Sequence, residues 1–494
     1  MFSRKNPSIP EYFSGKNIFL TGGTGFLGKV LIEKLLRSCP NVGDIYVLVR
    51  QKRGSTLKER REDIINAKLF DIVKEQNPKA LDKVKCIAGD TTELKLGISD
   101  EDERLITSKV NIIYHGAASV RFDDPLRSAV ITNIRSTREI VELASKCAKL
   151  EVFMHISTAY CNVDSTYIEE EMYPSPVHWK DAIDLAESDM DLSVMTVKYT
   201  DPWPNTYTFT KRIAEHVTAD LCKDKIPAVI FRPSIIVHAD SEPMPGWVDN
   251  MNGPFALAVA GLMGVACIFY AKKDSYLDFI SVDNVVKGML GATWETGLRK
   301  DKSKISIYNA CSELKYMMPW FALFQYKVGT KIFLEKTLWK FTVQIAQCWY
   351  WYYIRTMLHV ALSIAIDGIL KLQGRKPRLL KLVRLIYVVQ HALTYFMTHA
   401  FVFNTDNFDG LDKKYLECDK EAFRQVGRPK YMEEHFRKFS YNALLGVKRF
   451  VFKEREMTTE EAIAMNGRYL LAKHVLNYTL LAIFTYFVVV TWIL

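Results

Sequence analysis

Short apolar runs alternate with segments of helical periodicity from the N-terminus to about Tyr308. Each run is rich in β-branched, aliphatic or aromatic residues and ends at polar or turn-forming residues, as is typical of buried β-strands. Strands that alternate with helices predict an α/β fold with a doubly wound parallel sheet, covered by helices on both faces. The six predicted strands are Asn17–Thr21, Asp44–Arg50, Val84–Asp90, Val110–Tyr114, Glu151–Ser157 and Ala228–Arg232.

After Tyr308 the alternation fades and the periodicity becomes mainly helical. Apolar or amphipathic stretches of this kind predict a second, mainly α-helical C-terminal domain. The stretches lie at Phe321–Phe333, Leu338–Leu370, Leu379–Phe403 and Glu421–Phe452.

The last nineteen residues, Leu476–Leu494, contain no charged side chain. At about 1.5 Å per residue, a helix of this length spans roughly 30 Å, which is the thickness of the apolar core of a bilayer. The segment therefore predicts a C-terminal transmembrane helix that anchors the protein by its tail. The alternative is a buried terminal helix of the globular fold.

Two internal stretches, Met251–Tyr270 and Val343–Ile366, are also strongly apolar. The first is interrupted by Asn252, Gly253 and Pro254, and the second contains Arg355 and His359. These interruptions favour an acyl pocket lining or a shallow contact with the membrane interface over true membrane spans.

Charge and cysteine usage narrow the range of partners. The net charge is +10, with a conspicuous basic cluster at Lys371–Arg384 that fits an acidic lipid surface or an anionic substrate such as coenzyme A. A solvated basic face is the alternative. No zinc-finger or RNA-binding motif accompanies the cluster, so no nucleic-acid partner is expected. The nine cysteines show no CxxC pair and no secretory signal precedes them, which predicts reduced thiols and a catalytic part on the cytosolic side of any membrane.

A glycine-rich segment lies directly between the first predicted strand and a predicted helix. Glycine permits a tight turn, lets the backbone approach a diphosphate and allows the helix to pack closely on the strand, while the helix N-terminus binds the anion. The segment therefore predicts a dinucleotide site. Its residues are Thr21, Gly22, Gly23, Thr24, Gly25, Phe26, Leu27 and Gly28.

Residues after the next strands predict the rest of the cofactor site, because ligands of an open α/β sheet bind at the carboxyl ends of its strands. Arg50 ends the second strand where an NAD-preferring fold would have Asp or Glu, so a 2′-phosphate and hence NADPH are expected. An exposed basic loop is the alternative. Asp90 and Thr91 follow the third strand, and His115, Gly116, Ala117 and Ala118 close the fourth, where small residues would admit adenine and ribose.

Tyr207 and Lys211 are four residues apart and therefore share one helix face. The ammonium is expected to lower the phenol's pKa and to reach the nicotinamide ribose, while Tyr207 donates a proton to a carbonyl oxygen. Ser157 and Thr158 close the fifth strand and would hold and polarise that carbonyl.

Together with Arg232-Pro233-Ser234 after the sixth strand, these motifs make Lys16–Leu298 resemble the extended short-chain dehydrogenase/reductases, which have a Rossmann-like sheet. The resemblance implies catalytic roles for Thr158, Tyr207 and Lys211, with Ser157 as a helper. It also implies contact of Pro233 and Ser234 with the nicotinamide amide.

Within that superfamily the sequence is similar to the alcohol-forming fatty acyl-CoA reductases over nearly its whole length. The segments that carry the likeness are TGGTGFLGK, VLVR, HGAASVRF, HISTAYCN, DPWPNTYTFTKRIAE, FRPSII and PGWVDNMNGP. The likeness implies NADPH-dependent reduction of a long-chain acyl-CoA to a fatty alcohol through a bound aldehyde, with release of CoA and without a metal.

The predicted organisation follows from this likeness. An N-terminal tail at 1–15 precedes an NADPH-binding reductase domain at 16–308, a helical, membrane-contacting linker at 309–360, a helical domain at 361–455 and the anchor at 476–494. Peroxisomal and endoplasmic reticulum membranes both fit a tail anchor, and a homo-oligomer is left open. The alternatives are an extended reductase acting on a sterol or a nucleotide-sugar, and a non-catalytic membrane scaffold.

Overall fold

The computed structural model describes residues 6–51, 54–193, 196–251, 253–299, 301–312, 318–319, 331–339, 343–425 and 432–492. The chain forms two compact units, and each unit combines separate stretches of sequence. Unit 1 comprises Met1–Trp247, Asp278–Met317 and Phe401–Arg428, and unit 2 comprises Val248–Leu277, Met318–Ala400 and Pro429–Leu494. The continuous domain boundaries given above stay a prediction. The two compact units differ from them, because each unit is made of stretches that alternate along the chain.

Unit 1 is built on a seven-stranded sheet with the order β12-β7-β5-β4-β1-β2-β3. Every neighbouring pair in this sheet is parallel. The strands are β1 (Asn17–Thr21), β2 (Ile45–Val49), β3 (Val84–Ala88), β4 (Val110–His115), β5 (Val152–Ile156), β7 (Ala228–Pro233) and β12 (Ser306–Ala310). The predicted doubly wound parallel sheet is therefore confirmed, with all six predicted strands in it.

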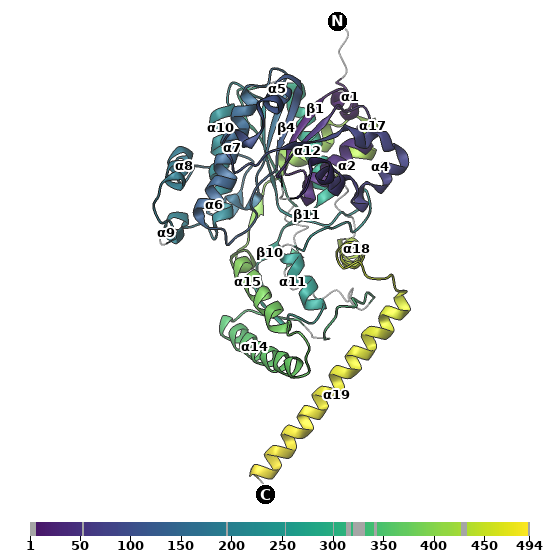
Figure 1. Cartoon of the computed structure of the whole chain (residues 1–494). Coiled ribbons are helices and arrows are strands. Elements are labelled where there is room, and N and C mark those ends of the chain that lie inside the picture. Colours follow the sequence, from purple (N-terminus) through teal and green to yellow (C-terminus); the bar gives the residue numbers. More distant parts are fainter. Residues whose placement is uncertain are drawn as a thin grey trace. The chain divides into compact units, whose positions relative to one another are not determined.

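Helices cover both faces of this sheet (Figure 1). α2 (Phe26–Ser38) and α12 (Val282–Arg299) pack together on one face, and α12 also contacts β5, β7 and β12. On the other face lie α5 (Asp100–Lys109), α7 (Ser136–Ser145) and α10 (Thr206–Cys222), with α7 packed against both α5 and α10. Burial on both faces explains why β1, β2, β5 and β7 are almost continuous apolar runs.

Shorter elements complete unit 1. The helices are α1 (Ile9–Phe13), α3 (Leu57–Ile65), α4 (Asp71–Gln76), α6 (Leu126–Val130), α8 (Trp179–Glu187), α9 (Thr196–Thr200), α16 (Asp406–Lys414) and α17 (Glu417–Phe423). Two small parallel pairs join β8 (Ile235–Val237) to β11 (Phe279–Ser281) and β6 (Tyr167–Ile168) to β15 (Val402–Phe403). The second pair brings a late stretch of the chain, Val402–Phe403, beside Tyr167–Ile168 of the same unit.

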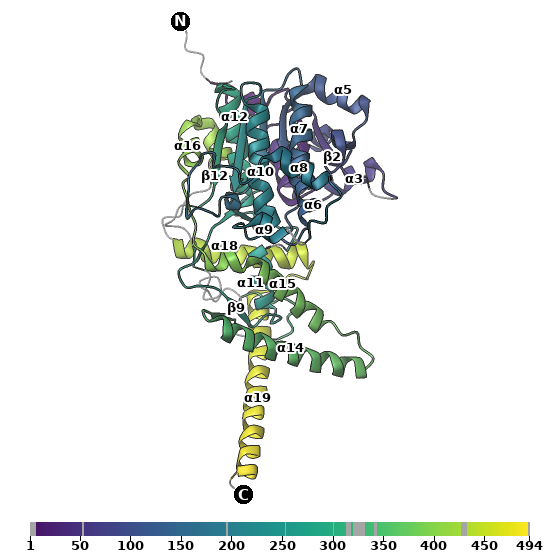
Figure 2. The same cartoon turned by 90° about the vertical axis from the view of Figure 1, so that its left-hand side faces the viewer.

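Unit 2 is mainly helical, as predicted for the C-terminal region (Figure 2). Its helices are α11 (Gly253–Leu262), α14 (Trp349–Leu372), α15 (Leu379–Thr398), α18 (Met432–Gly446) and α19 (Thr459–Trp492). Its strands form a parallel pair, β9 (Ile268–Tyr270) with β14 (Gln344–Ala346), and an antiparallel pair, β10 (Tyr276–Leu277) with β13 (Met318–Pro319).

Two helices among the described residues, α14 and α15, are long and apolar enough to cross a membrane. The apolar stretch Val343–Ile366 falls largely within α14, whereas Met251–Tyr270 is divided between α11 and β9 and therefore forms no single span. The predicted anchor at Leu476–Leu494 is helical as far as Trp492, and its last two residues lie outside the described residues.

Close packing of α12 against the returning stretch of chain depends on glycine. A Cβ atom at Gly291 would lie 1.9 Å from the hydroxyl oxygen of Tyr415, whose side chain is 4% exposed. Backbone and ring therefore meet at a distance that admits no side chain at position 291.

Gly291→Ala is expected to lower the free energy of unfolding by about 1–3 kcal/mol, because the buried ring of Tyr415 must move. Gly410→Ala in α16 is the matched control, since a Cβ there meets no atom within 4 Å. The control is expected to be neutral or to stabilise by up to about 1 kcal/mol. Thermal or urea unfolding of both variants measures the difference, and equal stability would contradict the packing argument.

Candidate active site

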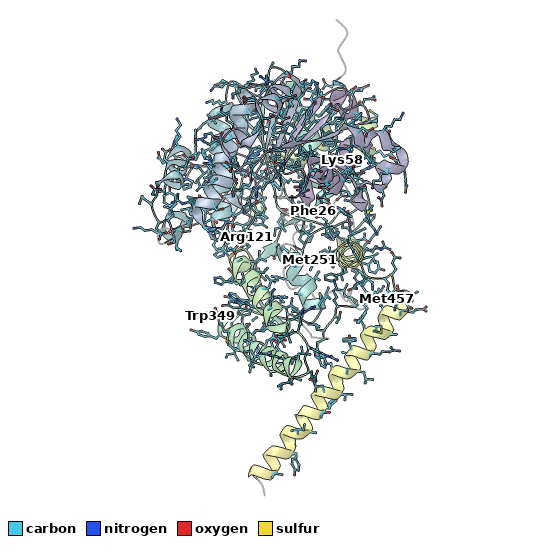
Figure 3. All side chains as sticks on the ribbon, viewed as in Figure 1. Phe26, Lys58, Arg121, Met251, Trp349 and Met457 are labelled. Carbon is cyan, nitrogen blue, oxygen red and sulfur yellow. The ribbon has the colours of Figure 1, made fainter. Side chains whose placement is uncertain are left out.

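The loop between β1 and α2 can be formed only with glycine at two of its positions. Gly22 has a φ of +79°, and a Cβ there would lie 2.8 Å from the carbonyl carbon of Gly116 in the loop after β4. At Gly28 a Cβ would lie 2.4 Å from the carbonyl oxygen of Gly22. Gly25 caps α2, which begins at Phe26 (labelled in Figure 3), so the first amides of the helix face this loop. The result is an anion-binding helix N-terminus of the kind that holds a diphosphate.

His115 connects the ends of β1 and β4. Its Nδ1 lies 2.9 Å from the hydroxyl of Thr21, and its Nε2 lies 3.2 Å from the hydroxyl of Thr137. Burial, with a smaller contribution from Lys211, lowers the pKa of His115 to about 3, so the ring is neutral. The amide of Ala117 donates to the same Thr21 hydroxyl at 3.1 Å. His115 therefore shapes the predicted cofactor loop through hydrogen bonds instead of through charge.

Arg50 and Asp90 meet at the ends of β2 and β3. The guanidinium donates to both carboxylate oxygens, with Nε at 2.6 Å from Oδ2 and one terminal nitrogen at 2.9 Å from Oδ1. Although burial opposes ionisation, hydrogen bonds from Thr92 and the charge of Arg50 hold the pKa of Asp90 below its usual range. The Arg50 side chain is 61% exposed, so it stays accessible to a ligand. Thr91, beside them, is buried.

The predicted reducing residues lie together at the carboxyl end of β5. Tyr207 and Lys211 share a face of α10, and the Thr158 hydroxyl lies near enough to the Tyr207 phenol to lower its pKa. The Lys211 ammonium donates to the carbonyl oxygen of Ile156 at 2.6 Å. Phe122 stacks on the Tyr207 ring with centroids 5.9 Å apart, a contact that no periodic pattern in the sequence indicates.

The acidity of Tyr207 differs from the expectation that Lys211 lowers it. Burial raises the pKa of the phenol above its usual range, the Cys161 thiol adds to the rise, and the hydrogen bond to Thr158 opposes it. Burial also lowers the pKa of the Lys211 ammonium to about 8, partly offset by Glu215. Desolvation is the largest cause, so the Tyr207 phenol keeps its proton.

Glu215 is a site residue that the sequence analysis missed. It forms a bidentate ion pair with Arg232 on β7, at 2.9 and 2.7 Å, and both side chains are almost completely buried. Burial opposes its charge, yet Arg232 holds the pKa of Glu215 below the usual range. A signal was available, because Glu215 follows Lys211 by four residues as Lys211 follows Tyr207.

The other predicted site residues are engaged in nearby contacts. The Ser157 hydroxyl donates to the Cys161 sulfur at 3.9 Å and helps to lower the pKa of Glu215, so Ser157 lies beside the buried ion pair. Its catalytic role stays a prediction. Pro233 ends β7, and the Ser234 amide donates to Ala310 at 3.0 Å, which places both residues at the same edge of the sheet. No cluster of three or more metal-ligating side chains occurs among the described residues.

Comparison with known proteins agrees with this geometry. Two models for male sterility protein match the chain, at residues 20–289 and 358–454. Fatty acyl-CoA reductase 1 of mouse is 38% identical over 453 residues, covering 90% of this chain and 87% of the relative. The fatty acyl-CoA reductase wat of Drosophila melanogaster is 34% identical, covering 96% of this chain and 90% of the relative.

Solved structures share the fold at low sequence identity. The terminal R domain of the myxalamid biosynthetic pathway superposes with a TM-score of 0.59 at 16% identity, covering 89% of this chain and 92% of that one. The R domain of a nonribosomal peptide synthetase from Mycobacterium tuberculosis has a TM-score of 0.57 at 18% identity, covering 90% and 94%. These likenesses concern the fold alone.

The sheet, the glycine loop and the Tyr/Lys helix define a nicotinamide-dependent oxidoreductase. The extent and identity of the matches to its relatives are more specific than the fold. The chain belongs to the fatty acyl-CoA reductase family.

Proposed function

We propose that this enzyme reduces a long-chain fatty acyl-CoA to the fatty alcohol, with NADPH as the hydride donor. The observation that carries the proposal is the placement of Tyr207 and Lys211 on one face of α10, with the Thr158 hydroxyl near enough to lower the pKa of the phenol, in a chain of this family. The substrate thioester would lie with its carbonyl oxygen between the two hydroxyl groups, beside the loop that holds the dinucleotide.

NADPH, when bound, supplies a hydride to the carbonyl carbon. Thr158 and Tyr207 hold the carbonyl oxygen, and Tyr207 transfers its phenolic proton to that oxygen as negative charge develops there. Collapse of the resulting hemithioacetal breaks the carbon–sulfur bond and leaves CoA thiol and a bound aldehyde. The same two residues then hold the aldehyde oxygen for a second reduction, so each alcohol consumes two NADPH.

Lys211 and Glu215 support this chemistry without touching the carbonyl. The Lys211 ammonium donates to the Ile156 carbonyl at 2.6 Å, at the end of β5, and from there it would contact the ribose hydroxyls of bound NADPH. Glu215 partly sustains the charge of Lys211 and is itself fixed by Arg232. The helix thus carries proton donor, cation and counter-ion at successive four-residue steps.

Tyr207→Phe is expected to lower kcat by about 10²–10⁴-fold, because the variant keeps the ring but loses the proton donor. NADPH oxidation with palmitoyl-CoA, with chromatography of the products, measures the effect. The wild type is expected to give fatty alcohol at about two NADPH per thioester. Tyr199→Phe, on the nearby α9, is the matched control and is expected to retain full turnover. An unchanged Tyr207→Phe variant would overturn the catalytic assignment.

The preference for NADPH is proposed to come from Arg50. Its guanidinium is exposed at the end of β2 and is held by Asp90, so it is oriented toward the ribose position of this fold. A 2′-phosphate would gain a charge-assisted hydrogen bond there, whereas a 2′-hydroxyl would gain little.

Arg50→Ala is expected to raise KM for NADPH by about 10-fold or more while KM for NADH changes little, because only the 2′-phosphate loses a charged partner. Lys58→Ala is the control, since it removes one exposed positive charge from α3 nearby (Figure 3). Steady-state kinetics with NADPH and with NADH distinguishes a loss of phosphate binding from a general disturbance of the cofactor loop. An equal rise for NADPH and NADH would show that Arg50 acts on the loop and not on the phosphate.

Membrane attachment is proposed to come from the end of α19. The first part of the helix packs on its own unit, where the Asn466 amide donates to the Ile332 carbonyl at 3.2 Å and Tyr469 contacts Phe333 with ring centroids 5.3 Å apart. From Leu470 onward most described side chains are exposed and apolar. We place the anchor in the membrane of the peroxisome or of the endoplasmic reticulum, with the catalytic unit on the cytosolic side.

Deletion of residues 476–494 is expected to leave the buried contacts of α19 intact and to remove integral attachment. Sedimentation of membranes washed with high salt measures the effect. The wild type is expected to remain in the pellet, and the deleted protein is expected to move to the supernatant. Retention of the deleted protein after the wash would show that another segment spans the bilayer.

A further inference from the structure

α14, the turn Gln373–Arg378 and α15 form an antiparallel helical pair, called here the α14–α15 hairpin. Figure 2 shows the two helices side by side, with the turn at the end away from β9. The Asp367 carboxylate closes the turn by accepting hydrogen bonds from the amides of Arg378, Leu379 and Leu380 at 2.9–3.1 Å. These three hydrogen bonds give the turn a defined conformation.

The hairpin exposes an unusual amount of apolar surface. Of the described large apolar side chains that are exposed, ten lie on α14, four on α15 and ten on α19, and only seven lie elsewhere in the chain. Leu358, Leu362 and Leu385 are each at least 50% exposed, and Leu372 beside the turn is 90% exposed. Scattered apolar residues are normal on a soluble surface, but such a concentration marks a binding face.

An aromatic group stands at one end of this surface and positive charge at the other. Trp349, Tyr350 and Trp351 begin α14 and are exposed, and Figure 3 shows Trp349 projecting outward from the first turn. Tryptophan and tyrosine favour the boundary between lipid and water. Lys371, Arg375, Lys376, Arg378, Lys381 and Arg384 surround the turn and are exposed. None of these six forms an ion pair with another described residue.

The contacts of the hairpin with the rest of unit 2 show whether α14 and α15 can cross a bilayer or can only lie on its surface. Near the first turns of α14, Tyr352 packs with Cys267 and Ile268, and the Tyr353 hydroxyl lies 3.1 Å from that of Tyr387 on α15. Farther along α15, the Gln390 amide donates to the Tyr270 carbonyl at 3.2 Å. One end of each helix is thus part of a protein core, so neither helix has its full length free for a bilayer about 30 Å thick.

We propose that the α14–α15 hairpin docks on the surface of an anionic membrane, with its exposed leucines in the interfacial layer and its basic turn on the lipid phosphates. Apolar burial and attraction to anionic headgroups act together in such interfacial helices, and neither is strong alone. Lysine and arginine that form no ion pair within the described part of the chain select an anionic lipid surface over another apolar protein face. The hairpin is then a second membrane contact, separate from the end of α19.

The test uses the protein lacking residues 476–494, whose described contacts of α19 at Asn466 and Tyr469 are retained. Flotation with vesicles of phosphatidylcholine alone, or with about one third phosphatidylserine, measures binding. Strong binding to the anionic vesicles and weak binding to the neutral ones is expected, with binding lost as salt rises. Equal binding to both vesicles, or none to either, overturns the proposal.

Two sets of variants separate the contributions. Lys376→Glu, Lys381→Glu and Arg384→Glu together are expected to weaken binding to anionic vesicles by about 100-fold or more. Lys58→Glu, Lys79→Glu and Lys149→Glu change the net charge equally on exposed sites of unit 1 and are expected to have little effect. Leu362→Asn with Leu385→Asn keeps the charge and is expected to weaken binding by removing apolar contact.

Two further measurements, KM for palmitoyl-CoA and the oligomeric state, distinguish membrane binding from binding of CoA or of a second copy of the chain. All variants are expected to keep the wild-type melting temperature and the wild-type KM for palmitoyl-CoA in detergent. A rise in KM upon charge reversal, with vesicle binding unchanged, would assign the basic turn to CoA and overturn the proposal. A stable dimer in solution that the two leucine substitutions dissociate, and that binds no vesicles, would assign the face to a second copy of the chain.

Discussion

Two opposite charges, buried side by side, hold the reducing helix on its sheet. Glu215 of α10 and Arg232 of β7 lie 2.7 Å apart with almost no exposed surface. Loss of either partner would leave an uncompensated charge in the interior, at a cost of about 3–5 kcal/mol. Arg232 also donates to the backbone carbonyls of Glu169 and Glu171, so its position is fixed independently of α10. The orientation of Tyr207 and Lys211 therefore depends on an ion pair that lies one helical turn beyond Lys211.

A steric constraint complements this electrostatic one at the cofactor loop. Gly22 and Gly116 belong to loops after different strands, yet their backbones approach so closely that a Cβ at Gly22 would be 2.8 Å from Gly116. His115 and Thr21 hydrogen-bond across the same gap. The two loops form one surface whose shape is set by missing side chains, and an anionic ligand meets backbone amides there instead of charged side chains.

The parts of the protein that could be predicted from the sequence are those whose structure is determined by residues close together in the chain. Five of the six predicted strands are almost completely buried runs, and the glycine loop and the Tyr/Lys spacing need fixed residue types at fixed intervals. β12 escaped prediction because Ser306 and Asn309 make its sequence polar, although it is entirely buried. The return of residues 401–428 rests on distant contacts, such as Glu170 accepting from the amide of Phe408, which no local pattern reveals. The acidity of Tyr207 depends on burial, and spacing does not encode burial.

The first helix of the chain has a partner near its end. The amide of Ile9, at the start of α1, donates to both carboxylate oxygens of Asp419, at 3.1 and 3.2 Å and 410 residues away. During synthesis this contact of the N-terminal helix therefore forms only after almost the whole polypeptide has been made. A chain that ends before Asp419 keeps the packing of α1 on α12 but leaves the first amide of the helix without its carboxylate acceptor.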